Sequence, residues 1–236
     1  MRKKIVLFCL MLCVLSPRAF ALFPKTDNDM RQLPPFCQAR MSQQETPEKA
    51  KWKKRLGTDF SHIHHLCAGI FTYKYAINTA TLTASQREFH LRKAIGETSY
   101  LIKHARKDFV LMPLVYTTQA KAFIGLKEYN EAIAHLNKAI DANPKYISPY
   151  IILSDLYFNQ GNFQEAANAL ERGLAVKPDS THLKVRYKKA LEARKLEGEV
   201  AKQPSDAGEP GQTGGETSLS DGATPDKAVT TEEKAE

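Results

Sequence analysis

Apolar and polar positions follow a helical period along most of the chain, and no stretch alternates like a β-strand bounded by hairpin turns. Thr46-Pro47-Glu48 predicts a helix start, because it supplies a capping hydroxyl, a proline at the first helical position and an acid in the first turn. A second helix is expected to begin at Thr58 or Asp59, and a third at Thr83, which has capping-box spacing to Gln86. The pattern predicts an all-α protein whose first helices cover 46–57, 60–78 and 83–104.

A repeat with a period of 34 residues occupies the middle of the chain. When 113–146 is set against 147–180, aromatic, small and proline positions coincide. The identical pairs are Tyr116/Tyr150, Glu131/Glu165, Ala132/Ala166, Leu136/Leu170 and Pro144/Pro178. Small residues such as Ala132 and Ala139 let two helices approach closely, and each proline ends the second helix of its unit.

This arrangement of aromatic, small and proline positions resembles the tetratricopeptide repeat. The resemblance covers 113–180 and implies antiparallel helical hairpins stacked as a short right-handed solenoid. Because each hairpin exposes an apolar face to its neighbour, both ends need a cover. We expect a degenerate helical hairpin over 46–112 and a capping helix over 181–200. In the capping helix Leu183, Tyr187 and Leu191 share the inner face, and five basic residues are expected to face solvent: Lys184, Arg186, Lys188, Lys189 and Arg194.

Residues 1–21 have the layout of a secretory signal peptide. Arg2-Lys3-Lys4 precedes an apolar run, and Ala19-Phe20-Ala21 favours cleavage after Ala21. The apolar run is about 11 residues long, too short to cross a hydrocarbon core of about 30 Å. We therefore expect an exported protein, periplasmic or secreted, that does not span the membrane after signal cleavage. The chain has no Asn-x-Ser/Thr acceptor, so a bacterial periplasm fits best.

Signal cleavage leaves two cysteines, Cys37 and Cys67. In an oxidising compartment such a pair predicts one disulfide. It would close a loop of about 30 residues, which the chain-entropy model values at about 3–4 kcal/mol. The segments Leu33–Cys37 and Asp59–Cys67 also resemble a block that precedes tetratricopeptide repeats in exported proteins of gammaproteobacteria. That resemblance implies export and no particular activity.

Charge divides the chain into a basic body and an acidic end. The formal charge of +8 falls to about +4 without the signal peptide, because four basic residues leave with it. The end, 201–236, has eight acidic and three basic residues and is rich in Gly, Ser, Thr and Pro, so we predict a disordered acidic tail. The predicted segments are a signal peptide (1–21), an irregular N-terminal arm (22–45), a degenerate hairpin region (46–112), two repeats (113–146 and 147–180), a capping helix (181–200) and the tail (201–236).

Tetratricopeptide arrays bind extended or helical peptides in a groove lined by the first helix of each repeat. The resemblance therefore implies a non-catalytic scaffold or adaptor with a protein or peptide partner and no cofactor. The family's groove positions fall on Thr117, Lys121, Ile124, Ile151, Asp155, Phe158 and Asn159. This lining does not reproduce the Lys/Asn/Arg carboxylate clamp of some chaperone-binding members. The basic body is compatible with nucleic acid, but the expected export argues against that partner.

The segment Ser61–Cys67 is the one chemically suggestive cluster, with His62, His64 and His65 beside Cys67. On a helix, His62 and His65 lie one turn apart on one face, and His64 and Cys67 on another. The alternative function is therefore a metal- or haem-binding protein. A structural zinc site usually needs four ligands, and there is no second cysteine pair or C-x-x-C-H motif. The competing interpretation is packed core histidines, and no catalytic motif such as G-x-S-x-G or H-E-x-x-H occurs.

Overall fold

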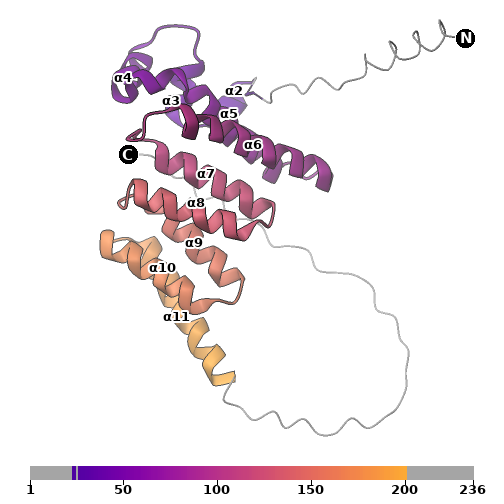
Figure 1. Ribbon diagram of the computed structural model, residues 1–236, viewed down its shortest axis with the longest axis vertical. Helices are drawn as coiled ribbons and strands as arrows, with labels where there is room; N and C mark the ends of the chain where they lie inside the picture. Colours follow the sequence, from indigo (N-terminus) through magenta and orange to yellow (C-terminus); the bar gives the residue numbers. More distant parts are fainter. Residues whose placement is uncertain (1–22, 25, 201–236) are drawn as a thin grey trace, which may run out of the picture. The chain divides into compact units, whose positions relative to one another are not determined.

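The computed structural model describes residues 23–24 and 26–200, so the predicted signal peptide (1–21) and acidic tail (201–236) lie outside the described residues. All regular secondary structure in the described part is helical (Figure 1). The elements are α2 (Asp27–Arg31), α3 (Pro35–Met41), α4 (Pro47–Leu56), the 3-10 helix η2 (Gly57–Ser61), α5 (Ile63–Asn78), α6 (Ala84–His104), α7 (Met112–Gly125), α8 (Tyr129–Ala142), α9 (Ser148–Asn159), α10 (Phe163–Val176) and α11 (Thr181–Val200). The predicted all-α fold is confirmed.

The chain divides into two compact units, with the division after Pro149. Unit 1 contains α2 to α8, and unit 2 contains α10, α11 and α9 from Tyr150 onward. In unit 1, α5 packs on α6, α6 on α7 and α7 on α8, while α3 packs on α4 and α5. In unit 2, α10 packs on α11. No helix of the described ranges is long and apolar enough to span a bilayer.

The arm 22–45, which the sequence predicts to be irregular, contains two short helices. A capping box starts α2: Thr26 Oγ1 accepts from Asp29 N at 3.1 Å, and Asp29 Oδ2 accepts from Thr26 N at 3.0 Å. Helix α3 begins at Pro35, and Phe36 beside it is 4% exposed in the core of unit 1. The prediction was wrong because Pro35 stands at the first position of α3, where a proline is favourable.

Helix α4 begins and ends where the sequence predicts. Thr46 Oγ1 accepts from the backbone N of the third helical residue, Lys49, at 3.1 Å. Gly57 ends the helix with φ of 60°, a left-handed conformation that glycine adopts without steric cost. The capping box of α6 is also present, with Thr83 and Gln86 exchanging bonds of 2.9 and 3.2 Å. Local capping chemistry therefore locates both helices.

The start of α5 differs from the prediction. Neither Thr58 nor Asp59 caps it, because residues 57–61 form η2 and α5 begins at Ile63. Asp59 is 2% exposed, and its carboxylate accepts from the backbone N of Arg106 at 3.2 Å and from its Nε at 2.9 Å. The carboxylate of Asp59 thus anchors the loop that follows α6, 47 residues along the chain.

The two repeats have the same local geometry. Helices α8 and α10 begin and end 34 residues apart, and so do the turns that precede them. Lys127 and Gly161 occupy equivalent turn positions with φ of 61° and 77°. The residue after each turn donates its backbone N–H at 2.9 Å, from Glu128 to Phe123 O and from Asn162 to Tyr157 O. Each repeat is therefore a helical hairpin closed by the same turn.

Candidate functional site

The first half of α7 is enclosed, which removes one predicted groove residue. Thr117 is fully buried, and its hydroxyl donates to Pro113 O at 2.7 Å. The residues from Thr117 to Ala122 are all buried except Lys121, and α5, α6 and α8 all pack on this helix. Thr117 therefore cannot contact a partner. The family's groove position does not apply to Thr117, because α5 and α6 pack on α7 in addition to α8.

The second half of α7 keeps two predicted groove residues in reach of solvent. Lys121 and Ile124 are both partly exposed. They lie three residues apart and so on one face of the helix. Together they give this face one cationic and one apolar side chain.

In unit 2, the four predicted groove residues lie on α9. Asp155 and Asn159 are exposed, whereas Ile151 and Phe158 are partly exposed. Phe158 packs its ring edge-on against Phe163, with the ring centroids 5.0 Å apart. The exposed acid and amide alternate with apolar side chains, so this helix offers both hydrogen-bonding and hydrophobic contacts.

Helix α11 places cations beside this face of α9. Arg186 Nε lies 3.2 Å from Asp155 Oδ1, and Lys189 Nζ lies 4.7 Å from the ring centroid of Phe158. As the sequence predicts, Lys189 and Arg194 are exposed, and Arg186 is partly exposed. Arg194 Nη1 also donates to Gln164 Oε1 at 2.7 Å. The i, i+3 spacing of Arg186 and Lys189 places both on one face of α11.

The histidines of α5 pack on α6 in unit 1. His65 Nδ1 lies 2.8 Å from Glu97 Oε2, and the His65 ring stacks on Tyr100 with centroids 3.8 Å apart. The Tyr100 ring stacks in turn on His104 at 4.0 Å, and His62 lies 5.7 Å from Tyr100. As the helical spacing predicts, His62 and His65 share one face. That face contacts α6.

The geometry does not assemble the histidine segment into a metal site. His64 Nδ1 lies 2.9 Å from Ser61 O, and burial, followed by the neighbouring His65, lowers the pKa of His64. The sulfur of Cys67 lies beside that of Cys37, away from solvent. Across residues 23–24 and 26–200, no group of three or more His, Cys, Asp or Glu side chains is placed to hold a metal ion.

The two cysteines bring the N-terminal arm against α5. Cys37 on α3 and Cys67 on α5 are both fully buried, with Cα atoms 5.6 Å apart and sulfur atoms 2.06 Å apart. Both belong to the core of unit 1. The predicted pair of cysteines is therefore in proximity.

A 34-residue unit of two helices, with small residues in the second and a left-handed turn between them, defines a tetratricopeptide-type helical repeat. Residues 123–193 match the family model described as tetratricopeptide repeat. The chain is also similar to "Small glutamine-rich tetratricopeptide repeat-containing protein 2" from Mycosarcoma maydis, at 31% identity over 72 residues. That match covers 30% of this chain and 20% of the relative, so the chain spans about a fifth of the relative's length. Both findings support tetratricopeptide repeats in this chain, and such repeats suggest a scaffold for protein–protein interaction.

Proposed function

We propose that this protein is an exported, periplasmic tetratricopeptide scaffold that binds a protein or peptide partner through the first helices of its repeats. The observation that carries the proposal is the mixed polar and apolar exposure of these helices. Lys121 and Ile124 stay accessible on α7, and Asp155 and Asn159 on α9. Helical faces of this composition bind peptides by combining apolar contact with specific hydrogen bonds. Thr117 is left out because it is buried.

Two features support export. One is the signal-peptide layout of 1–21, and the other is the proximity of Cys37 and Cys67, which we infer to be joined as a disulfide. Thiols are counted in the unfolded protein, purified from the periplasm, before and after reduction. We expect none before reduction and two afterwards. Two thiols before reduction would remove the disulfide and with it this support for an oxidising compartment.

The proposed role of these helices is tested by a double substitution at one partly exposed and one exposed residue. Lys121→Glu with Asn159→Ala changes charge and hydrogen bonding on α7 and α9. Phe158 is unsuitable for this test, because it packs on Phe163 and its truncation would also destabilise the hairpin. We expect partner recovery from the native envelope to fall about tenfold, which corresponds to about 1.4 kcal/mol.

A matched control carries the same kinds of change on the other helix of the first repeat. Lys138→Glu with Asn130→Ala alters two exposed residues of α8. Recovery should stay within about twofold of the wild type, and circular dichroism should show the same helicity for all proteins. Equal recovery with both double variants would reject the groove as the binding surface.

A further inference from the structure

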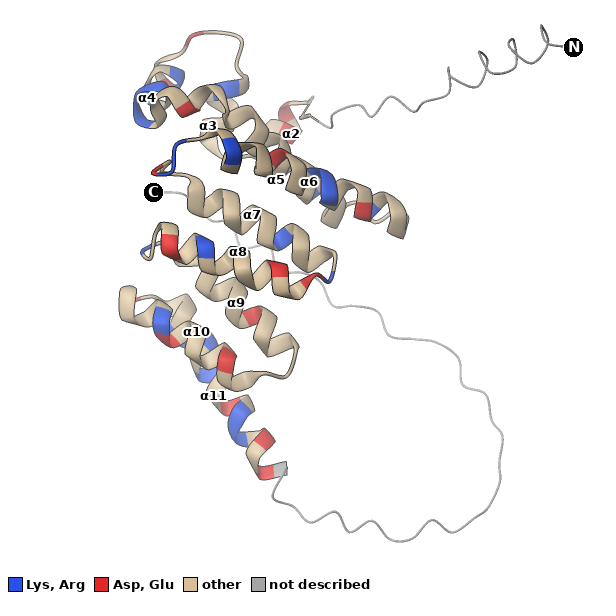
Figure 2. Ribbon diagram, in the orientation of Figure 1, with Lys and Arg blue, Asp and Glu red and all other residues tan. Residues whose placement is uncertain are grey.

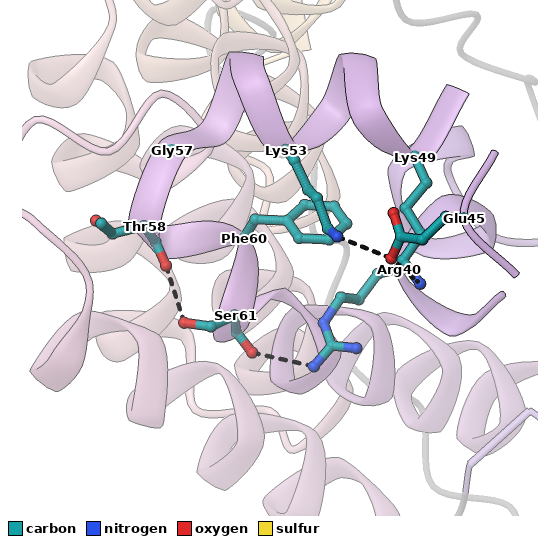
Figure 3. Close-up of a pocket in the computed structure, with 8 residues that line it drawn as sticks. All are labelled: Arg40, Glu45, Lys49, Lys53, Gly57, Thr58, Phe60 and Ser61. Carbon is teal, nitrogen blue, oxygen red and sulfur yellow. Dashed lines mark hydrogen bonds and ion pairs between the residues drawn. The ribbon is translucent and has the colours of Figure 1, made fainter. Parts of the chain in front are cut away.

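A hollow of about 550 Å³ opens in unit 1 beside α3, α4 and η2 (Figure 3). Three of its lining residues are cations and one is an acid. The lining residues are Arg40, Glu45, Lys49, Lys53, Gly57, Thr58, Phe60 and Ser61. None of them was singled out as a binding residue by the sequence. They come from three elements and the loop before α4, so only the fold brings them together.

Two of the cations are held in place by neutral groups. Lys49 has a side chain only 10% exposed, and its Nζ donates to Ser42 O at 2.9 Å. Arg40 Nη2 donates to Ser61 O at 3.4 Å, and its guanidinium lies 5.9 Å from the ring centroid of Phe60. Carbonyl oxygens and an aromatic ring orient these side chains without cancelling their charge. Arg40 Nε is buried and has no hydrogen-bond partner among the described residues.

Glu45, the acid in the hollow, shows that the cations can bind a carboxylate. Glu45 Oε1 lies 2.8 Å from Lys53 Nζ and 3.3 Å from Lys49 Nζ. Dashed lines in Figure 3 mark both contacts. The hydrogen bond from Lys53 is the main cause that lowers the pKa of Glu45. The Glu45 side chain is 65% exposed, and an ion pair in solvent is weak and exchanges readily. A carboxylate thus occupies the lysine pair but is not locked there.

Helix α4 has further cations outside the hollow. Figure 2 shows Lys and Arg concentrated on this helix. Besides the two lysines of the hollow, α4 has exposed Lys51, Lys54 and Arg55, against a single acid, Glu48. A helix with this excess of positive charge attracts a ligand with several negative groups more strongly than a lone anion.

We propose that this hollow and α4 form a docking site for an acidic peptide segment of a partner protein. One Asp or Glu carboxylate of the segment displaces Glu45 from Lys53 and Lys49, and further acids contact the exposed cations of α4. The partly exposed Arg40 supplies an additional donor. The proposal rests on the scaffold function and specifies its partner class, but it uses residues other than those of the groove on α7 and α9. Glu45 then acts as an internal competitor that weakens binding of acidic ligands.

The test measures binding of a fluorescein-labelled hexaglutamate peptide to the full chain after signal cleavage, by fluorescence anisotropy at two salt concentrations. Glu45→Gln should tighten binding about two- to fivefold, because it removes one exposed competing ion pair. Lys53→Gln, at an exposed position that cannot unfold the protein, should weaken it, and Arg40→Gln with Lys53→Gln should weaken it at least about tenfold.

The control is Lys138→Gln with Lys145→Gln, which removes two charges from exposed positions outside the hollow. It should bind within about twofold of the wild type. Equal weakening by both double variants, or no tightening by Glu45→Gln, would overturn the site. Inorganic phosphate or vesicles with anionic lipid that bind more tightly than the peptide would also overturn it, in favour of a phosphate or membrane ligand. Because the assay contains no native partner, its failure leaves the groove test intact.

Discussion

Gly69 lies where α5 and α6 pack, and a single added methyl group there tests how closely these helices are held. An ideal Cβ on Gly69 would lie 2.7 Å from Thr98 Cγ2 and 3.3 Å from Ala94 O, and real Cβ contacts are essentially never shorter than 3.0 Å. Thr98 cannot turn its methyl away easily, because its hydroxyl donates to Ala94 O at 2.8 Å and to Ile95 O at 3.0 Å. Overpacking of this kind costs about 1–3 kcal/mol. Replacement of a helical glycine by alanine returns about 1 kcal/mol, so Gly69→Ala should destabilise the protein by up to about 2 kcal/mol.

The same substitution elsewhere in the hairpin should have the opposite sign. A Cβ on Gly96, an exposed residue within α6, would meet no atom within 4 Å, so Gly96→Ala should stabilise by about 0.5–1 kcal/mol. Adding Thr98→Ser to Gly69→Ala removes the clashing methyl but keeps the hydroxyl, and should recover about 1 kcal/mol. Urea unfolding followed by circular dichroism measures all four proteins. Equal stability of the two alanine variants, or no recovery in the double variant, would refute the close approach of α5 and α6.

Two further predictions concern the repeat turn and acid stability. Lys127 has φ of 61°, where a side chain costs about 1–2 kcal/mol. Lys127→Gly should therefore raise the free energy of unfolding by about 1 kcal/mol, and Gly161→Ala should lower it by a similar amount. Calorimetry measures both changes, and two changes of the same sign would contradict the prediction. Burial lowers the pKa of His64 below its ordinary value of 6.5, so the folded state binds fewer protons than the unfolded state. The neutral His64 contributes its full stabilisation above pH 6.5, and this stabilisation is lost as the pH falls through the lowered pKa of His64. The free energy of unfolding of His64→Gln should therefore fall less than that of the wild type as the pH is lowered. An equal fall in both proteins would contradict the prediction.

The sequence predicts those parts of the fold that depend on patterns of neighbouring residues. Thr46 and Gly57 bound α4 through capping and a left-handed turn, and both lie within or next to the helix that they delimit. The period of 34 between 113–146 and 147–180 aligns α8 with α10 to the residue, because each repeat must satisfy the same packing and the same turn. In these cases the residues that determine a structure are close in sequence to the structure itself.

What could not be predicted depends on contacts between residues far apart in the chain. Asp59 was a plausible helix cap by spacing, but its carboxylate bonds Arg106. Arg40 and Lys49 belong to different helices, and only the packing of α3 on α4 places them in one hollow. The histidines had the composition of a metal site, yet the ring of His65 is used for stacking and for Glu97. Residue type alone does not distinguish packing from ligation, since an imidazole ring serves both.

Whether a predicted groove residue is exposed or buried depends on where the chain departs from a regular repeat array. The family match begins at residue 123, beyond Thr117 and Lys121, although the helix itself begins at Met112. Over that first part, α5 and α6 pack on α7 in addition to its own partner α8, so its side chains become core residues. Thr117 is buried where this chain adds helices, whereas the predicted positions on α9 stay exposed or partly exposed. We propose that Lys121 and Ile124, next to the added helices, are the residues of α7 that a partner contacts.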